Sequence, residues 1–347
     1  MNSFSLERII RPHLLNLKPY SSARDEFKGK ASVFLDANEN PVAGSYNRYP
    51  DPRQSELKAL LARIKKIDPD QLFLGNGSDE PIDLLIRACC EPGKDRILIP
   101  VPTYGMYQVS AAIHDIAVDQ VTLAPDFSLP AERMLSAITP ETKLIFLCSP
   151  NNPSGNRFDT DAVTKIMTYF NGIVVVDEAY IDFCPSGSFT EHLVQHPNLV
   201  ILQTLSKAWG LAGLRLGLCM AQPELIAVLN RIKAPYNISS LVQETVIREL
   251  KGKSVPPDAA MIIEERNRLA GRLAELPEVL QVFPGEANFL LVKFNDASAT
   301  YGYLRNHGII VRDRSHEPLC GSCLRITVGT PDENDLLINT LKLYPNN

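Results

Sequence analysis

The sequence lacks several features that mark other classes of protein. It has no apolar run near the roughly 20 residues that span a bilayer, and no apolar signal-peptide core near its N-terminus. Its formal net charge of −5 argues against a nucleic-acid-binding surface. Its 7 cysteines are odd in number and scattered, which argues against a disulfide framework. We therefore expect a cytoplasmic protein that binds neither nucleic acid nor membranes.

Two short motifs resemble known ligand sites but are incomplete. The turn Gly75–Gly77 lacks the third glycine of the dinucleotide fingerprint and the lysine of a P-loop. The run Cys320–Cys323 has the spacing of a redox or zinc pair, but no second pair accompanies it, so we interpret it as structural and expect no metal centre. A dehydrogenase that has lost its fingerprint and a module that binds a phosphorylated ligand stay open as alternatives.

The arrangement of apolar runs predicts an α/β protein. A chain of 347 residues can bury a large core. From about residue 44 to 240 apolar strands alternate with helices, which predicts a mainly parallel sheet with helices on its faces. We predict an N-terminal arm and part of a small domain at residues 1–43, with a strand at Val33–Leu35. A large domain follows at residues 44–240 and a small α+β domain at 241–347.

The predicted small domain begins with helical periodicity and ends in short strands. Met261–Leu276 has the pattern of a long amphipathic helix with one charged face. Apolar runs bounded by polar residues then predict strands. These strands are Val279–Phe283, Phe289–Val292, Ile309–Arg312 and Leu324–Val328.

Lys207 lies among small and apolar residues in the run Thr204–Gly217. Partial burial disfavours the ammonium form, lowers the pKa and makes a lysine a nucleophile towards an aldehyde. Ser206 beside it and Arg215 further along are both able to bind a phosphate. Together they predict a lysine that condenses with an aldehyde whose phosphate is held nearby, which describes pyridoxal 5′-phosphate. A surface lysine in a glycine-rich loop is the alternative.

Asp177 follows the apolar run Ile173–Val176, which predicts a buried strand of a parallel sheet. It therefore lies at the carboxyl end of a strand, where open α/β sheets bind ligands. A carboxylate there can pair with a protonated pyridine nitrogen and keep the ring an electron sink. Tyr180 lies close enough in sequence to hydrogen-bond the 3′ oxygen of the ring. An acidic loop without function is the alternative for Asp177 alone.

The turn Ser149–Gly155 follows another predicted strand, at residues 143–147. Prolines on both sides of its two asparagines restrict the backbone and stiffen the turn. A stiff turn can hold the amide of Asn152 where it donates to a ring oxygen.

Two more strand ends carry candidate contacts. An apolar strand leads into Gly77, and Ser78 or Asp79 is predicted to cap the helix that follows. Free amides at a helix N-terminus bind phosphate, so this turn could complete a phosphate site. Tyr104 comes after the next predicted strand and can stack on a pyridine face.

These elements, in this order and spacing, resemble those of the fold-type I pyridoxal-phosphate aminotransferases of the aspartate aminotransferase superfamily. Within that superfamily the chain resembles the histidinol-phosphate aminotransferases, and the resemblance covers almost the whole chain. It implies a large domain with a mainly parallel seven-stranded sheet, a smaller α+β domain and an N-terminal arm. The motifs that carry it are Asp36–Pro41, Asn47–Pro52, Gly77–Glu80, Ser149–Gly155, Asp177–Tyr180, Thr204–Gly217 and Leu324–Thr330.

The resemblance also implies roles for residues outside these strand ends. Arg325 matches the superfamily arginine that binds the substrate carboxylate, and Asn152 would contact substrate as well as cofactor. Arg312 is a second candidate for a substrate phosphate, with a surface ion pair as the alternative. Tyr20 would close over the substrate from the arm. Tyr49 matches a tyrosine that reaches the cofactor phosphate of the neighbouring subunit, which implies a homodimer with shared sites.

The implied activity is transamination of L-histidinol phosphate with 2-oxoglutarate, which yields imidazole-acetol phosphate and L-glutamate in histidine biosynthesis. Lys207 would move a proton as general acid and base, with Asp177 and Tyr180 as the other catalytic residues. A threonine-phosphate decarboxylase and an aromatic or broad-specificity aminotransferase fit the same motifs and stay open.

Overall fold

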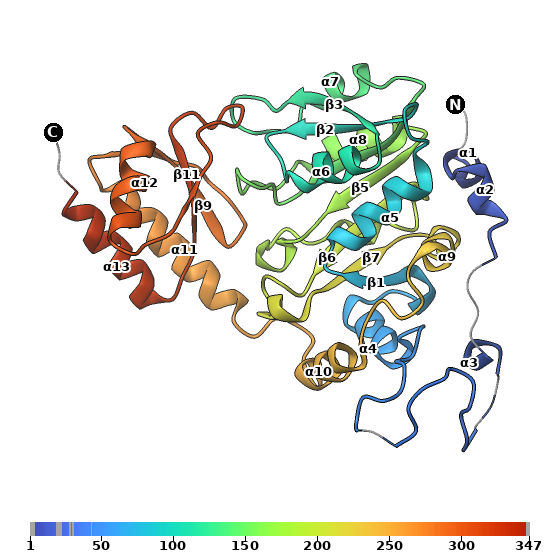
Figure 1. Cartoon of the computed structure of the whole chain (residues 1–347). Helices are drawn as coiled ribbons and strands as arrows, with labels where there is room; N and C mark the ends of the chain where they lie inside the picture. The colour runs from blue at the N-terminus through green and yellow to red at the C-terminus, as the bar shows by residue number, and fades with distance from the viewer. Residues whose placement is uncertain (1–3, 19–22, 28, 30, 43, 345–347) are drawn as a thin grey trace.

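The computed structural model describes residues 4–18, 23–27, 29, 31–42 and 44–344. Figure 1 shows two lobes, a larger one that contains β1–β7 and a smaller one that contains β9, β11 and the last three helices. Across the described ranges, each helix is too short or too polar to cross a membrane.

The large lobe is built on a seven-stranded sheet with the strand order β1-β7-β6-β5-β4-β2-β3. Every strand runs parallel to the others except β7, which lies antiparallel between β1 and β6. The predicted seven-stranded, mainly parallel sheet is therefore confirmed. The strands are β1 (Leu72–Asn76), β2 (Arg96–Val101), β3 (Ala117–Thr122), β4 (Thr142–Cys148), β5 (Ile173–Asp177), β6 (Leu199–Thr204) and β7 (Leu216–Met220).

Helices cover both faces of this sheet, because alternate residues of each strand point to opposite faces. In β5, Val174 and Val176 pack into one apolar layer, whereas Ile173 and Val175 pack into the other. Burial on both faces is why β5 reads as a continuous apolar run. The first layer includes α4 (Ser55–Lys65), α7 (Ala131–Ser136), α8 (Thr160–Tyr169) and α10 (Ser240–Leu250); the second includes α5 (Asp79–Cys89), α6 (Met106–Ile113) and α9 (Pro223–Ile232).

The small lobe contains a four-stranded antiparallel sheet with the order β10-β11-β9-β8. Leu324 and Ile326 of β11 pack under the helices, so the alternate residues Cys323 and Arg325 point to the opposite face. Cys323 on that face belongs to the core of the large lobe, so Arg325 is turned towards the large lobe. The elements are β8 (Val279–Val282), β9 (Phe289–Phe294), β10 (Arg312–Asp313), β11 (Cys323–Thr327), α11 (Ala259–Ala274), α12 (Ala297–Asn306) and α13 (Pro331–Lys342).

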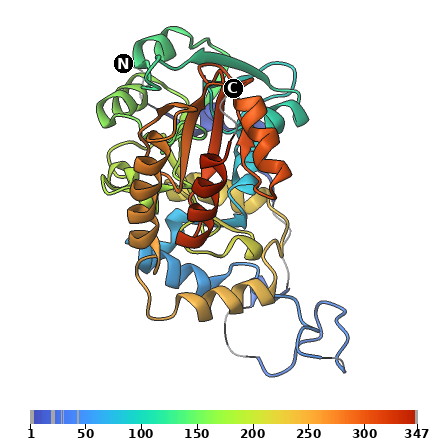
Figure 2. The same ribbon diagram turned by 90° about the vertical axis from the view of Figure 1, so that its left-hand side faces the viewer.

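The N-terminal segment differs from the sequence prediction. Val33–Leu35 forms no strand, and the side chains of Val33 and Leu35 are 69% and 88% exposed. The prediction is wrong because an apolar run forms a strand only beside another strand, and none of the described strands pairs with this one. Figure 2 shows the blue segment that follows α3 extending beyond both lobes. The short helices are α1 (Leu6–Ile9), α2 (Pro12–Leu15), α3 (Ala23–Glu26), η1 (Pro69–Gln71), η2 (Ile181–Phe183), η3 (Phe189–His192) and η4 (Ala212–Leu214).

Two other elements refine the predicted organisation. Strand β10 covers only Arg312–Asp313, which is shorter than the predicted strand. Helix α10 begins at the predicted boundary, at Ser240, yet its Val246 and Leu250 pack in the core of the large lobe. The division into residues 44–240 and 241–347 stays a prediction.

Candidate active site

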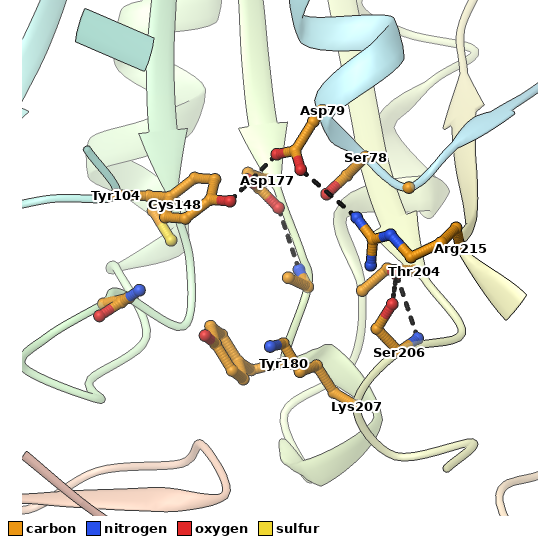
Figure 3. Close-up of a pocket in the computed structure, with 13 residues that line it drawn as sticks. Ser78, Asp79, Tyr104, Cys148, Asp177, Tyr180, Thr204, Ser206, Lys207 and Arg215 are labelled. Atoms are coloured by element: carbon orange, nitrogen blue, oxygen red, sulfur yellow. Dashed lines mark hydrogen bonds and ion pairs between the residues drawn. The ribbon is translucent and has the colours of Figure 1, made fainter. Parts of the chain in front are cut away.

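The candidate site lies at the carboxyl-terminal edge of the large sheet, where open α/β sheets bind ligands. Strands β1, β2, β4, β5 and β6 end at this edge, and β7 begins there because it runs the opposite way. The turns at this edge line a pocket. Every cofactor-binding residue predicted from the sequence lines it except Tyr49. The lining residues are Gly77, Ser78, Asp79, Tyr104, Cys148, Asn152, Asp177, Ala179, Tyr180, Thr204, Ser206, Lys207 and Arg215 (Figure 3).

Lys207 lies in the turn after β6, with its Nζ 5.6 Å from the centre of the Tyr180 ring. Its amine has no hydrogen-bond or ion-pair partner within the described ranges. Partial burial lowers the pKa of Lys207, and the positive charges of Arg325 and Arg215 lower it further. The predicted direction of this pKa shift is confirmed, and an unpaired amine of lowered pKa is suited to attack an aldehyde.

Asp177 ends β5 with its carboxylate fully enclosed. The Tyr107 hydroxyl donates to its Oδ2 at 2.7 Å, and the Ala179 N–H donates to its Oδ1 at 3.1 Å. Burial raises the pKa of Asp177 to about 6, although both hydrogen bonds favour the charged form. A cationic ring nitrogen beside this carboxylate would offset the cost of its burial, so Asp177 fits a pyridinium partner.

Tyr107 is a site residue that the sequence reasoning missed. It lies inside α6, its side chain is buried, and its ring stacks on Phe146 with centroids 4.8 Å apart. An aromatic residue in an amphipathic helix predicts packing, and nothing local indicates that its hydroxyl reaches Asp177. Only the packing of α6 on the large sheet brings the two side chains together.

The other end of the pocket is rich in hydrogen-bond donors. Arg215 Nη2 lies 3.5 Å from Asp79 Oδ2, and the Tyr104 hydroxyl donates to Asp79 Oδ1 at 3.0 Å (Figure 3). The Thr204 hydroxyl donates to Ser206 Oγ at 3.0 Å, which leaves the hydroxyl hydrogen of Ser206 free to donate elsewhere. The first N–H groups of a helix such as α5 lack intrahelical partners and bind anions. This end of the pocket fits a phosphate.

Two glycines bring Arg215 next to the start of α5. A Cβ on Gly77, whose φ is +69°, would lie 2.6 Å from Arg215 Nη2. A Cβ on Gly217 would lie 2.2 Å from the backbone carbonyl carbon of Gly77. Arg215 itself has a φ of +51°, a conformation that is uncommon outside glycine and is found at ligand sites. The glycines in these motifs therefore allow the close approach of two chain segments.

The two asparagines of the turn after β4 have different surroundings. Asn151 is buried, and its amide donates to Pro102 O at 3.1 Å and to Ser154 Oγ at 2.7 Å. Asn152 accepts a hydrogen bond on Oδ1 from Arg325 Nη1 at 2.6 Å. Because an arginine only donates, this bond orients the Asn152 oxygen towards Arg325 and leaves the amide NH₂ for the pocket. Asn151 holds the turn, and Asn152 links the pocket to the small lobe.

The Tyr180 hydroxyl has no hydrogen-bond partner in the part of the chain that the structure describes. Its ring packs edge-on against Phe289 of β9, with centroids 5.1 Å apart. Burial raises the pKa of Tyr180 well above its usual range, which keeps the phenol protonated and able to donate. A ligand oxygen in the pocket would give this hydroxyl its partner.

The structure places the predicted substrate residues in different surroundings. Arg312 is exposed and lies directly opposite Arg325 in the β10–β11 pair, so both side chains lie on one face of the sheet. Tyr49 stacks on Tyr236 with centroids 4.5 Å apart, in a separate surface pocket. Tyr20 lies outside the described residues. The sequence reasoning also missed Arg314, which lies next to Asn152 and pairs with Glu317.

Comparisons with known proteins agree with this geometry. Residues 24–341 match the family model for aminotransferase class I and II. The histidinol-phosphate aminotransferase of Parabacteroides distasonis is 54% identical over 338 residues, which cover 97% of this chain and 98% of that protein. That of Cytophaga hutchinsonii is 51% identical over 347 residues, which cover 99% of this chain and 100% of that protein. The structure of the Sinorhizobium meliloti histidinol-phosphate aminotransferase in complex with pyridoxal-5′-phosphate is 25% identical, with a TM-score of 0.78, and the match covers 88% of this chain and 89% of that one.

Proposed function

Because the chain belongs to the class I and II aminotransferases, and within them to the histidinol-phosphate aminotransferases, we propose that it transfers the amino group of L-histidinol phosphate to 2-oxoglutarate. The enzyme depends on pyridoxal 5′-phosphate, and the products are imidazole-acetol phosphate and L-glutamate. One observation carries the proposal. The unpaired amine of Lys207 shares a pocket with the buried carboxylate of Asp177, with the donors Ser206 and Arg215, and with Asn152, which Arg325 contacts.

The cofactor supplies an aldehyde for the amino group and an electron sink for the carbanion that forms at Cα of the substrate. Asp177 would pair with the ring nitrogen, which is supported by the burial of its carboxylate at the pocket. Tyr180 and Asn152 would donate to the 3′ oxygen, and the ring of Tyr104 would stack on the pyridine. The phosphate would be held by Gly77, Ser78 and Asp79 through the start of α5, and by Ser206 and Arg215.

Lys207 is the proposed nucleophile and proton carrier. Its lowered pKa increases the fraction of neutral amine at neutral pH, and a general base works best when its pKa is near the working pH. With substrate bound, the Lys207 amine would take the proton from the substrate Cα as general base, and the cofactor would supply the electron sink. Lys207 would also return that proton as general acid, because no other unpaired amine lines the pocket among the described residues.

Arg325 is the proposed anchor for the anionic end of each substrate. Burial and the nearby charge of Arg314 lower its pKa, so an anion that binds there relieves an unfavourable charge. A guanidinium binds a phosphate or a carboxylate through two parallel hydrogen bonds. Arg325 can therefore hold histidinol phosphate in one half-reaction and glutamate in the other, with Arg312 on the same face as a second contact.

We infer that the enzyme is a homodimer in which Tyr49 serves the neighbouring site. Val33, Leu35, Val42 and Tyr49 are exposed apolar or aromatic side chains on one N-terminal segment, which a second copy would cover. Tyr49 is absent from the lining of its own chain's pocket. These observations support a shared site.

Complementation tests the shared site. Lys207→Ala and Tyr49→Ala proteins, each inactive, are mixed under conditions that let subunits exchange. A shared site gives heterodimers with one intact site, so activity returns to about a quarter of wild type at random assortment. If Tyr49 serves its own chain, each site keeps a lesion and mixing restores nothing.

We also propose that the enzyme works in the cytoplasm. All seven cysteines are free and buried, which suits a reducing compartment. Cys320 and Cys323 are unpaired as well, and burial raises the pKa of Cys323 to about 11, so that thiol is mostly unreactive.

An amino-donor panel tests the proposed reaction. Purified enzyme is loaded with cofactor and given histidinol phosphate, threonine phosphate, phenylalanine or aspartate, each with 2-oxoglutarate. We expect glutamate to form fastest from histidinol phosphate. Release of CO₂ from threonine phosphate without glutamate formation would make the protein a decarboxylase. Equal rates from phenylalanine and histidinol phosphate would make it a broad-specificity aminotransferase.

A further inference from the structure

The loop between β10 and β11 carries a third arginine beside the two that the sequence indicated. Arg314 is part-buried, with 15% of its side chain exposed. Its Nη2 lies 3.4 Å from Oδ1 of Asn152, the same oxygen that accepts a hydrogen bond from Arg325. Because Asn152 lines the cofactor pocket, Arg314 lies beside the place where an amino donor must bind.

The polar groups of this loop are incompletely paired. Arg314 Nη1 donates to Oε1 of Glu317 and makes a single contact where a bidentate pair would make two. Arg314 Nε, Ser315 Oγ and Glu317 Oε2 are buried and have no hydrogen-bond partner in the described part of the chain. Most buried polar atoms in folded proteins are bonded, so unpaired atoms so close together indicate a site that a ligand completes. Arg314 Nε and Ser315 Oγ can donate to an anion, whereas Glu317 Oε2 only accepts.

The charges around this loop favour an anion. Arg312, Arg314 and Arg325 bring three positive charges, and Glu317 brings one negative charge, which leaves an excess of two. Asp313 pairs with Leu324 on the other face of the strand pair and accepts the Ser315 N–H at 2.8 Å. Like charges close together repel, and the charge of Arg314 lowers the pKa of Arg325. A dianion neutralises this excess, whereas a monoanion leaves one charge uncompensated.

We propose that Arg314 is a specificity-determining residue that favours a phosphate over a carboxylate at this end of the site. The inference rests on the proposed function, in which a phosphate enters in one half-reaction and a carboxylate in the other. A carboxylate offers two oxygens, which one guanidinium satisfies, whereas a phosphate offers three and carries up to two charges. Glu317 holds Arg314 when no substrate is bound and competes with the substrate for it.

Single-turnover kinetics of the two half-reactions test the inference. Arg314→Gln keeps an amide that can donate to Asn152 but removes the charge. We expect kcat/KM for histidinol phosphate to fall about tenfold or more, because the variant loses a strong hydrogen bond between the guanidinium and the phosphate. We expect kcat/KM for glutamate to fall no more than about threefold, because Arg325 alone can hold its carboxylate. Glu317→Gln removes the competing carboxylate and should raise kcat/KM for histidinol phosphate about threefold.

Three comparisons sharpen the test. Arg325→Gln should lower kcat/KM in both half-reactions, because it removes the proposed anchor of both substrates. Arg305→Gln, a change on α12 at an arginine that lies over the Tyr301 ring, should leave both unchanged. Inorganic phosphate should inhibit the glutamate half-reaction competitively, and Arg314→Gln should raise its inhibition constant about tenfold. The phosphate measurement does not depend on which amino donor is natural.

Equal losses in both half-reactions of Arg314→Gln would mean that Arg314 acts only by positioning Asn152, and no loss in either would mean that it has no role. Both results overturn the inference. If Arg314→Gln does not fold, Arg314→Lys keeps the charge and should retain most of the preference for phosphate; loss of that preference overturns the inference too. The two proposals can fail separately. If the wild-type enzyme does not react with histidinol phosphate, the proposed function is refuted. If Arg314→Gln still weakens inhibition by inorganic phosphate, the role of Arg314 is intact.

Discussion

On the large-lobe side of the pocket, Asp177 accepts two hydrogen bonds and Asp79 accepts one from Tyr104. On the small-lobe side, Arg314 and Glu317 have buried atoms that find no partner among the described residues. In the proposed function the first side binds a cofactor that stays through many turnovers, and its carboxylates are paired in advance, although the Lys207 amine and the Tyr180 hydroxyl await the ligand. The second side would accept and release two substrates of different charge. The difference suggests that the enzyme preorganises the carboxylates of its cofactor site and leaves the pairing of its substrate site to the ligand.

The largest effect is expected from replacing Lys207, on the large-lobe side of the pocket. Lys207→Ala should lower turnover by at least about 10³-fold, because general acid–base catalysis alone contributes about 10² to 10⁴. The variant should still bind cofactor without a covalent bond, since the phosphate donors remain. Turnover, together with borohydride trapping of the cofactor, measures both effects. Lys165→Ala, at a surface ion pair with Glu132, is the matched control and should behave as wild type. Activity near wild type in Lys207→Ala would refute the assigned chemistry.

Replacing Asp177 by asparagine removes a negative charge from the large-lobe side of the pocket and keeps the shape of the side chain. Asp177→Asn should slow the half-reaction with either substrate about a hundredfold, because breaking a buried ion pair costs about 3 kcal/mol. Both half-reactions should slow alike, in contrast to the selective loss expected for Arg314→Gln. Single-turnover rates with both amino donors provide the comparison. A loss below about tenfold would mean that another group holds the ring nitrogen protonated.

Tyr107→Phe removes one hydrogen bond from Asp177 and keeps the ring that stacks on Phe146. The hydroxyl favours the charged carboxylate, so its loss should raise the pKa of Asp177 further. We expect a fall in kcat of about tenfold, which corresponds to about 1.4 kcal/mol and lies near the low end of what a hydrogen bond to a charged group contributes. The acid limb of the pH–rate profile should also move to higher pH. An unchanged acid limb would assign that limb to another group.

The smallest expected effect is on the stability of the cofactor-free protein. The pKa of Asp177 is about 6 when folded and about 3.9 when unfolded, so between pH 4 and pH 6 the folded state binds more protons. Stability from this group is therefore present below pH 4 and is lost as the pH rises through 6. The asparagine in Asp177→Asn does not titrate. The melting temperature of this variant minus that of wild type should therefore rise by a few degrees between pH 4 and pH 7.

Saturating cofactor should abolish that gain in the same melting experiment, because a pyridinium partner stabilises the ionised carboxylate. A constant difference in melting temperature between the two cofactor-free proteins across this pH range would contradict the assignment of a raised pKa to Asp177.

Much of the pocket could be predicted because its residues follow apolar runs. The end of a parallel strand can be predicted from the sequence, and the carboxyl ends of parallel strands lie at one edge of the sheet. Asp177, Asn152 and Lys207 could therefore be placed together from the sequence alone. Tyr107 and Arg314 could not, because each lies far in sequence from its partner and in a context that predicts packing or a surface loop. The strand predicted at Val33–Leu35 is wrong for a related reason: a strand depends on a neighbour that local sequence does not contain.

The sequence by itself determined which chemical groups stand at the strand ends, because alternation and turn residues act over a few residues. Only the tertiary structure decided that Arg325 on the small lobe bonds Asn152 on the large lobe and that burial raises the pKa of Asp177. It also decided that three polar atoms of the β10–β11 loop have no hydrogen-bond partner in the described part of the chain. Burial, charge and orientation depend on segments that are distant in the chain, and they exist only after those segments have packed.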